Sequence, residues 1–188
     1  MVFMRRATLV LSVLMAGVSG GSAYAQRSGS ENYLGASIGT YMPTQSRVRE
    51  AFGSSMVSYG ITVVQPYRPN SARLRFDVDS LSLSRNGNRF FFIGGSAGYT
   101  VGFGPVQGEN RNAGFLRIGA GPAYFDYDVT QNFTKRSGRR LALYGTAEAG
   151  YTVAKNILVS TRYVQTPKFD GYDFSGVELR LTFAAVKL

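Results

Sequence analysis

The sequence has 188 residues, of which 44% are hydrophobic and 17% charged, a size and composition typical of one folded domain. It contains no Cys, His or Trp. This excludes Ser-His-Asp and Cys-His catalytic arrangements, thiolate or imidazole metal sites and disulfides. The formal net charge of +10 raises the question of an anionic partner, either nucleic acid or a membrane surface.

The first 25 residues have the three parts of a secretory signal peptide. Arg5 and Arg6 form the basic end, an apolar run covers 7–18, and Ala23-Tyr24-Ala25 supplies a small-x-small cleavage site. The run is too short to span a bilayer, and an uncleaved amphipathic anchor is the alternative. Cleavage after Ala25 removes two arginines and no acidic residue, so residues 26–188 form a mature domain with a net charge of +8. Export argues against nucleic acid as a partner.

From residue 32 onwards, apolar residues alternate with small or polar ones at a period of two, which predicts β-strands. Segment 44–52 is expected to be a loop rather than a helical turn. A change of phase near Ser80 predicts a β-bulge, and Pro122 lies inside the fifth strand. The predicted strands cover 32–42, 56–65, a third segment from 72, 89–104, 113–127, 141–153, 157–164 and 174–183. Strands joined in sequence by turns predict an antiparallel meander.

Side-chain size indicates which strand face lines the interior. The face opposite the apolar residues carries mainly Gly, Ser and Thr, as at Gly94, Ser96 and Gly98. A solvent-exposed sheet surface normally carries longer polar side chains, whereas the interior of a closed eight-stranded barrel favours small ones. We therefore expect the small residues inside and the apolar residues outside, as in a transmembrane barrel. A soluble barrel with an aromatic core is the alternative.

Outward aromatic residues are expected to form two girdles at the membrane interfaces. With the N-terminus on the periplasmic side, the periplasmic girdle contains Phe103, Tyr151 and Phe183, and the outer girdle contains Phe91, Tyr124 and Tyr163.

The last two predicted hairpins, residues 147–157 and 176–183 with Arg162-Tyr163 between them, resemble the small eight-stranded outer-membrane β-barrel superfamily, the opacity-type and OmpA/OmpX-like barrels. The resemblance extends over residues 32–183 as a strand pattern. It implies an all-β, antiparallel, up-and-down transmembrane barrel in the bacterial outer membrane. Such families typically end on an aromatic residue read by the barrel-insertion machinery, whereas Phe183 is followed here by Ala-Ala-Val-Lys-Leu188. The lack of Trp is a second departure.

Charged residues on the inward face predict a network inside the barrel. Buried charges persist only when they are paired and hydrogen-bonded. We therefore expect a charged plug that fills the barrel and fixes its register, as the resemblance also implies. A gate or proton-coupled site is the alternative. The predicted network comprises Arg75, Asp77, Arg117, Glu148, Arg162, Glu178 and Arg180.

Four connections, 43–55, 84–88, 129–140 and 165–173, are expected on the outer side. The third has no acidic residue and contains four cations, Lys135, Arg136, Arg139 and Arg140. Their guanidinium and ammonium groups are suited to phosphates of lipopolysaccharide or to another extracellular anionic surface. A solvated basic loop is the alternative.

The absence of His argues against barrel enzymes that resemble deacylases, phospholipases or proteases, and no nucleophile–base pair is recognisable. The sequence therefore predicts a non-catalytic, monomeric outer-membrane barrel with a structural or surface-interaction role and no cofactor or metal. Its expected partners are outer-membrane lipid, lipopolysaccharide and, during biogenesis, the barrel-insertion machinery. The alternatives are a soluble lipocalin-like barrel that binds a small apolar ligand and a narrow channel for small solutes.

Overall fold

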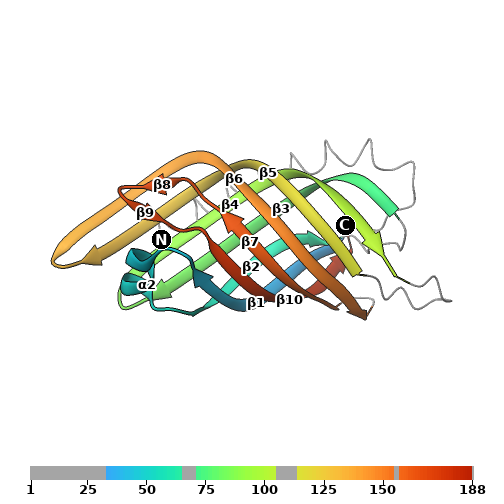
Figure 1. Cartoon of the computed structure of the whole chain (residues 1–188), viewed down its shortest axis with the longest axis horizontal. Coiled ribbons are helices and arrows are strands. Elements are labelled where there is room, and N and C mark those ends of the chain that lie inside the picture. Colours follow the sequence, from blue (N-terminus) through green and yellow to red (C-terminus); the bar gives the residue numbers. More distant parts are fainter. Residues whose placement is uncertain (1–32, 65–70, 105–113, 155–156, 188) are drawn as a thin grey trace. The chain divides into compact units, whose positions relative to one another are not determined.

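The computed structural model describes residues 33–64, 71–104, 114–154 and 157–187. Within them, eight strands close into a barrel, and strands adjacent in the chain are adjacent in the sheet (Figure 1). The barrel strands are β1 (Tyr33–Pro43), β2 (Met56–Val64), β3 (Ser71–Arg85), β4 (Asn88–Phe103), β5 (Gly114–Gln131), β6 (Thr134–Ala154), β7 (Ile157–Gln165) and β10 (Gly176–Lys187). The antiparallel pair β1–β10 closes the barrel. The predicted all-β, eight-stranded architecture is confirmed. The predicted signal peptide, 1–25, lies outside the described residues.

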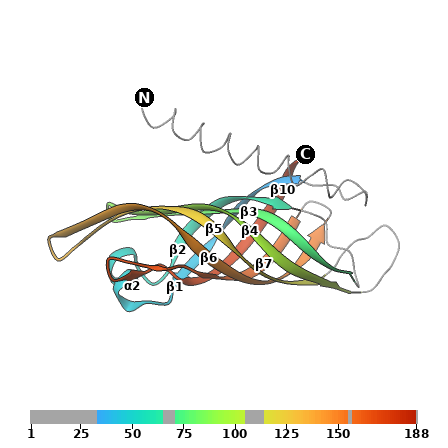
Figure 2. The same cartoon turned by 90° about the horizontal axis from the view of Figure 1, so that it is seen from above.

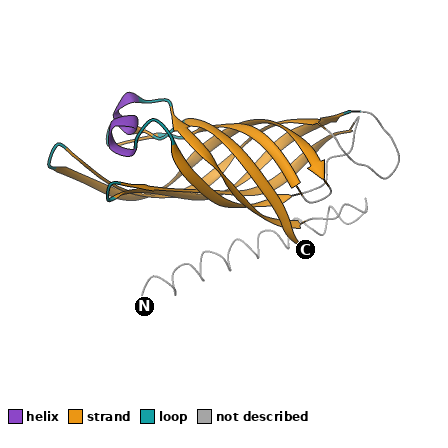
Figure 3. Cartoon of the chain, turned by 90° about the horizontal axis from the view of Figure 1, so that it is seen from below, coloured by secondary structure: helices purple, strands orange, loops and turns teal. Residues whose placement is uncertain are grey.

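Three short elements lie at one end of the barrel, which we call the outer end. They are the helix α2 (Ser46–Phe52; Figures 2 and 3) and the paired strands β8 (Lys168–Phe169) and β9 (Tyr172–Asp173), which are labelled in Figure 1. The turns of the β3–β4 and β5–β6 hairpins lie at the same end, whereas β1 begins and β10 ends at the opposite end.

The helix α2 corrects the expectation of a loop over 44–52. Val48, Ala51 and Phe52 are buried, and their spacing places them on one face of a helix. Gly53, with φ +98°, ends the helix in a conformation that favours glycine. Packing of this face against the barrel therefore stabilises a segment too short to be helical by propensity alone. In the described part of the chain, no helix has the length and apolar character needed to cross a bilayer.

Strand β3 pairs with β4 without interruption from Ser71 to Arg85, so the predicted bulge near Ser80 is wrong. The change of phase has another cause. Asp79 and Leu81 are both buried on the inward face, so the lining of the barrel changes from charged to apolar while the register continues. Register shifts occur instead between Leu34 and Gly35 and between Thr152 and Ala154.

Strand β10 continues beyond Phe183, whereas the families that the sequence resembles typically end on such an aromatic residue. Ala184 pairs with Gly35 and Lys187 pairs with Tyr33. The residues after Phe183 therefore complete the closure of the barrel against β1.

The assignment of the two strand faces is confirmed in the part of the barrel that lies away from the outer end. Gly94, Ser96 and Gly98 are buried inside, and glycine is needed where strands approach closely, because a Cβ on Gly98 would lie 2.6 Å from the carbonyl oxygen of Ile118. The outward side chain of Ile118 is 68% exposed. An apolar outer wall around a polar, small-residue interior is the pattern of a membrane-spanning barrel.

The outer part of the barrel has the opposite polarity. Its interior is filled by an aromatic cluster that includes Phe90, Phe125 and Phe174, all fully buried. Phe90 stacks on Phe174 with ring centroids 4.1 Å apart. The outward positions here carry polar residues such as Ser84 and Thr130. This outer extension is thus built like a soluble barrel and continues the membrane-spanning part into solvent.

Candidate functional site

Asp79 is the centre of the charged network inside the barrel. Its carboxylate lies 2.9 Å from Nη1 of Arg162, 3.3 Å from Nη2 of Arg117 and 3.8 Å from Nη1 of Arg180. The hydroxyl of Tyr144 donates a hydrogen bond to the same carboxylate at 3.2 Å. Strands β3, β5, β6, β7 and β10 are joined through this one fully buried side chain.

Glu148 and Glu178 complete the pairing of the same arginines. Glu148 lies 2.7 Å from Nη2 of Arg180 and 3.4 Å from Nη1 of Arg117. Glu178 lies 2.6 Å from Nη2 of Arg162, and Asp77 lies 3.1 Å from Nε of Arg117. All of these side chains are buried. Ser58 donates a hydrogen bond to the oxygen of Glu178 that Arg162 does not contact, and Ser160 donates to the oxygen of Glu148 that Arg180 also contacts.

The structure thus brings together six of the seven residues predicted for the network. The side chain of Arg75 lies outside the described residues. Asp79 and Tyr144 were missed, although Asp79 follows Asp77 by two residues and so shares its face of β3. Buried carboxylates and guanidiniums that neutralise one another fill the interior, as expected of a plug.

The basic segment 129–140 is not a loop, which corrects the prediction. Residues up to Gln131 belong to β5 and residues from Thr134 belong to β6, so only the turn Asn132-Phe133 separates the strands. This hairpin projects beyond the other connections at the outer end (Figure 1). The four cations therefore alternate between its two faces instead of forming one basic patch.

Two of these cations belong to a charged ladder on the outer wall of β4, β5 and β6. Asp126 lies 3.6 Å from Nη2 of Arg89 and 3.5 Å from Nε of Arg139. One level further out, Lys135 lies 3.0 Å from Asp128. The side chains of the three cations are 42%, 55% and 64% exposed, in the order Arg89, Arg139 and Lys135. We call these five residues the outer-wall ladder; it carries a net charge of +1.

The ladder begins where the apolar outer wall ends. Asp126 pairs in register with Phe91, and Tyr124 pairs with Leu141, which is 77% exposed. Phosphates of an outer-leaflet lipid lie at such a boundary, because its acyl chains contact apolar side chains and its headgroup is in water.

The other two cations lie on the inward face of the hairpin. Arg140 lies 3.8 Å from Asp170, and Asp170 accepts a hydrogen bond of 2.5 Å from the hydroxyl of Tyr127. Burial, together with this hydrogen bond, raises the pKa of Tyr127. Arg136 makes no ion pair with another described residue and lies beside a pocket.

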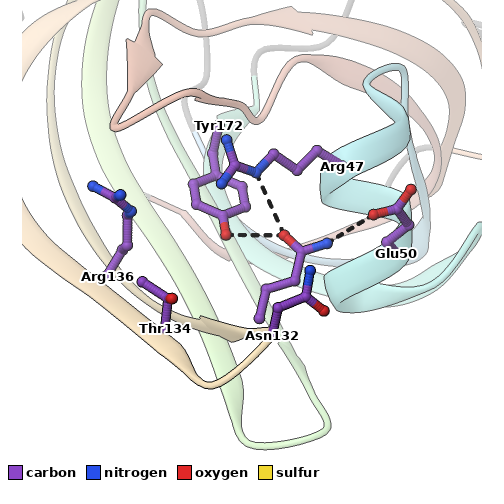
Figure 4. Close-up of a pocket in the computed structure, with 7 residues that line it drawn as sticks. Arg47, Glu50, Asn132, Thr134, Arg136 and Tyr172 are labelled. Carbon is purple, nitrogen blue, oxygen red and sulfur yellow. Dashed lines mark hydrogen bonds between the residues drawn. The ribbon is translucent and has the colours of Figure 1, made fainter.

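That pocket, of about 480 Å³, lies between α2, β9 and the β5–β6 hairpin (Figure 4). Gln131 accepts hydrogen bonds from Nε of Arg47 at 3.4 Å and from the hydroxyl of Tyr172 at 3.0 Å, and donates to Glu50 at 2.7 Å. The guanidinium of Arg47 also lies 4.5 Å from the ring centroid of Tyr172. These contacts connect the helix to the hairpin. The sequence held no signal for the pocket, since its residues come from three separate segments. Its lining comprises Arg47, Glu50, Gln131, Asn132, Thr134, Arg136 and Tyr172.

The six predicted girdle residues all occupy outward positions near the expected rims. Phe103, Tyr151 and Phe183, at the end opposite the outer end, are 48%, 45% and 42% exposed. Tyr163 is 37% exposed, and Phe91 and Tyr124 are half-buried. Their positions suit a membrane girdle, which stays a prediction.

A closed eight-stranded barrel with a charged interior and an apolar outer wall defines an outer-membrane β-barrel, and the protein is located in the bacterial outer membrane. The family model for lipid A 3-O-deacylase (PagL) matches residues 56–164, more than half of the chain. The chain belongs to this family.

Several solved structures are similar to the chain. Neisserial surface protein A (NspA) is 14% identical with a TM-score of 0.46, over 82% of this chain and 97% of that one. Ail of Yersinia pestis is 12% identical with a TM-score of 0.48, over 82% and 95%. The N-terminal β-barrel domain of Pseudomonas aeruginosa OprF is 11% identical with a TM-score of 0.48, over 81% and 96%. A search of curated protein sequences found no match.

The prediction that the protein is not an enzyme is wrong, because lipid A 3-O-deacylase is an enzyme family. The prediction relied on the absence of His. That absence excludes a Ser-His pair in this chain. It does not exclude ester hydrolysis in which a group other than His activates the hydroxyl of Ser, Thr or Tyr.

Proposed function

We propose that this barrel acts on lipid A, or on a closely related acylated phosphoglycolipid, held against the outer wall of β4, β5 and β6. The observation that carries the proposal is the outer-wall ladder, whose exposed Arg89 and Arg139 lie directly above the apolar wall. Family membership supports the choice of ligand, since lipid A is the substrate in the name of the family.

The two chemical parts of lipid A match the two parts of this wall. Its acyl chains would lie along outward apolar side chains such as Ile118, Leu141 and Leu143, which are 68%, 77% and 73% exposed. Its phosphates would accept charge-assisted hydrogen bonds from Arg89 and Arg139. Asp126 holds both guanidiniums at one height, so the ladder is already arranged before the lipid binds.

The reaction that follows from family membership is hydrolysis of the ester at position 3 of lipid A. Water adds to the ester carbonyl, and the products are a free fatty acid and a lipid A hydroxyl. The ladder would position the headgroup, and the apolar wall would position the acyl chain. The predicted surface-interaction role is retained here as binding of an anionic glycolipid from the outer leaflet.

Binding and hydrolysis can be measured in one preparation of the refolded barrel in detergent micelles with purified lipid A. The variant Arg89→Gln/Arg139→Gln removes both exposed guanidiniums of the ladder. We expect its affinity to fall about tenfold or more, since hydrogen bonds between charged groups contribute on the order of 1.5–3 kcal/mol each. Mass spectrometry of the lipid reports loss of the 3-O-linked acyl chain.

The matched control is Arg140→Gln, which removes a cation from the inward face of the same hairpin. It should leave lipid A affinity within about twofold of the wild type. Equal affinity of the ladder variant and the wild type would contradict the proposed site. Equal binding of lipid A and of a zwitterionic phospholipid would contradict the proposed ligand.

A further inference from the structure

The β5–β6 hairpin ends in a turn whose sequence does not suit its conformation. Asn132 and Phe133 have φ +49° and +61°, and a two-residue hairpin turn with positive φ at both positions favours Asn followed by Gly. The β3–β4 hairpin has that favoured pair, since Asn86 and Gly87 have φ +50° and +77°. Phe133 thus stands where the same barrel elsewhere uses glycine.

Phe133 is also fully exposed, at 106% of its reference surface. A bulky aromatic residue at positive φ is strained, and its exposed ring is unfavourable in water. Neither feature stabilises the isolated barrel. A single exposed aromatic residue is ordinary, but one held at positive φ in a turn is a backbone outlier, and such outliers motivate a functional hypothesis. The ring at this tip is placed for contact with something outside the molecule.

The height of the turn limits what that contact can be. Phe133 lies nine residues beyond Tyr124 along β5 and the turn, which is roughly 30 Å of extended chain and about 20 Å along the axis of a barrel with tilted strands. The hairpin projects past α2 and the other connections (Figure 3). Its tip therefore lies well above the apolar wall and cannot reach the hydrocarbon of the barrel's own membrane.

The surroundings of the tip are polar and cationic. Asn132 and Thr134 flank Phe133 and are both exposed. Lys135 is 64% exposed, and Arg136 makes no ion pair with another residue in the described part of the chain. One aromatic ring with cations just behind it is the combination that binds an anionic bilayer interface. A stable protein interface buries about 800 Å² on each partner around its aromatic anchors, whereas the residues on either side of Phe133, from Gln131 to Arg136, are all polar or charged.

We propose that the hairpin tip docks on the surface of a second, anionic phospholipid bilayer that faces the outer end of the barrel. Phe133 enters the interface of that bilayer, and Lys135 and Arg136 contact its headgroup phosphates. The proposal does not depend on lipid A binding by Arg89 and Arg139. It shares only Lys135 with the outer-wall ladder, its anchor is Phe133, and its membrane is not the one that the barrel spans.

Co-flotation tests this with the barrel held in phosphatidylcholine nanodiscs and mixed with vesicles of phosphatidylglycerol and phosphatidylcholine. Wild type should float with these vesicles and not with vesicles of phosphatidylcholine alone. Phe133→Gly should bind at least about tenfold more weakly, as expected for loss of one buried aromatic ring. Because the change creates an Asn-Gly turn like Asn86-Gly87, the variant should unfold at the same or a higher temperature than the wild type.

Further variants separate the contributions of the ring and the charges. Phe133→Trp should retain binding. Lys135→Gln/Arg136→Gln should lower it and flatten its dependence on salt, whereas Lys168→Gln, an exposed cation on β8, should not. Unchanged binding by Phe133→Gly, or equal flotation with both kinds of vesicle, would overturn the proposal. Flotation only with vesicles that contain lipopolysaccharide would assign the tip to a glycan and would equally overturn it.

Discussion

Asp79 shows how much of the fold can depend on one residue. It lies among three arginines from three different strands, and its fully buried carboxylate has no solvent to replace any of them. Without Asp79, the guanidiniums of Arg117, Arg162 and Arg180 stay buried and each loses one carboxylate partner, which is costly in a low-dielectric interior. Loss of the Asp79 carboxylate is therefore expected to destabilise the barrel strongly.

We expect Asp79→Ala to lower the free energy of unfolding by about 3–5 kcal/mol. The barrel is reconstituted in bilayers and titrated with urea. The loss of its compact band on unheated gels then measures the fraction of unfolded protein. The control is Asp128→Ala, which removes a carboxylate from an exposed ion pair with Lys135 and should cost at most about 1 kcal/mol. Equal losses of unfolding free energy in the two variants would contradict a special contribution of Asp79 to stability.

At the scale of the element, the outer end is closed by segments that have little stability of their own. The helix α2 and the pair β8–β9 are short, yet they contribute Phe52, Phe169 and Tyr172 to one aromatic cluster. Phe174 is central, with rings of Phe90, Phe52, Tyr172 and Tyr127 within 4.1–6.1 Å of its own. The cluster therefore couples α2 and the β8–β9 pair, which together we call the cap, to the barrel strands.

The variant Phe174→Ala should lower the free energy of unfolding of the outer end by about 3–5 kcal/mol, since a buried ring is replaced by a cavity. Hydrogen exchange should show loss of protection in α2 and β8–β9 first, while the charged network stays protected. Phe133→Ala removes a ring that contacts solvent only, and it should change stability by at most about 0.5 kcal/mol. Uniform loss of protection along the whole barrel would contradict a separable cap.

At the scale of the whole molecule, the described strands change character along their length. One part of the barrel has a charged interior and an apolar outer wall, and the outer extension has an aromatic interior and a polar outer wall. Below the level of Tyr124, β5 carries Leu116 and Ile118 outward and Arg117 inward. Above it, Phe125 points inward and Thr130 outward. One strand can serve both environments because each side chain follows the same two-residue alternation, and only the residue types change.

A cation placed on the outer wall tests where the membrane ends. Ile118→Arg lies mid-way along the apolar part of β5 and should destabilise the barrel in bilayers by about 2–4 kcal/mol. Thr130→Arg faces outward on the same strand but in the outer extension, and it should cost at most about 1 kcal/mol. Similar losses for the two variants, measured by urea unfolding, would show that the apolar band extends further than the structure indicates.

Much of the candidate site was predictable, because residues two apart on a strand share a face. This rule placed Arg117, Glu148 and Glu178 in the interior from the sequence. It could not place Asp79 at the centre, since contacts across the barrel depend on the relative height of non-neighbouring strands. It also could not show that Arg139 faces the outer wall and that Arg140 faces inward to Asp170, because both were assigned to a loop.

The sequence by itself determined the number and order of the membrane strands and the face that lipid contacts, because both follow from local alternation and side-chain size. Tertiary structure decided how far the β5–β6 hairpin extends, that 46–52 is helical and that an aromatic cluster closes the outer end, since each depends on contacts between distant segments. The charge of +8 expected after signal cleavage is likewise interpretable only in three dimensions. The interior network combines three described arginines with four carboxylates, so the positive excess lies outside it, in part on the outer wall and at the hairpin tip.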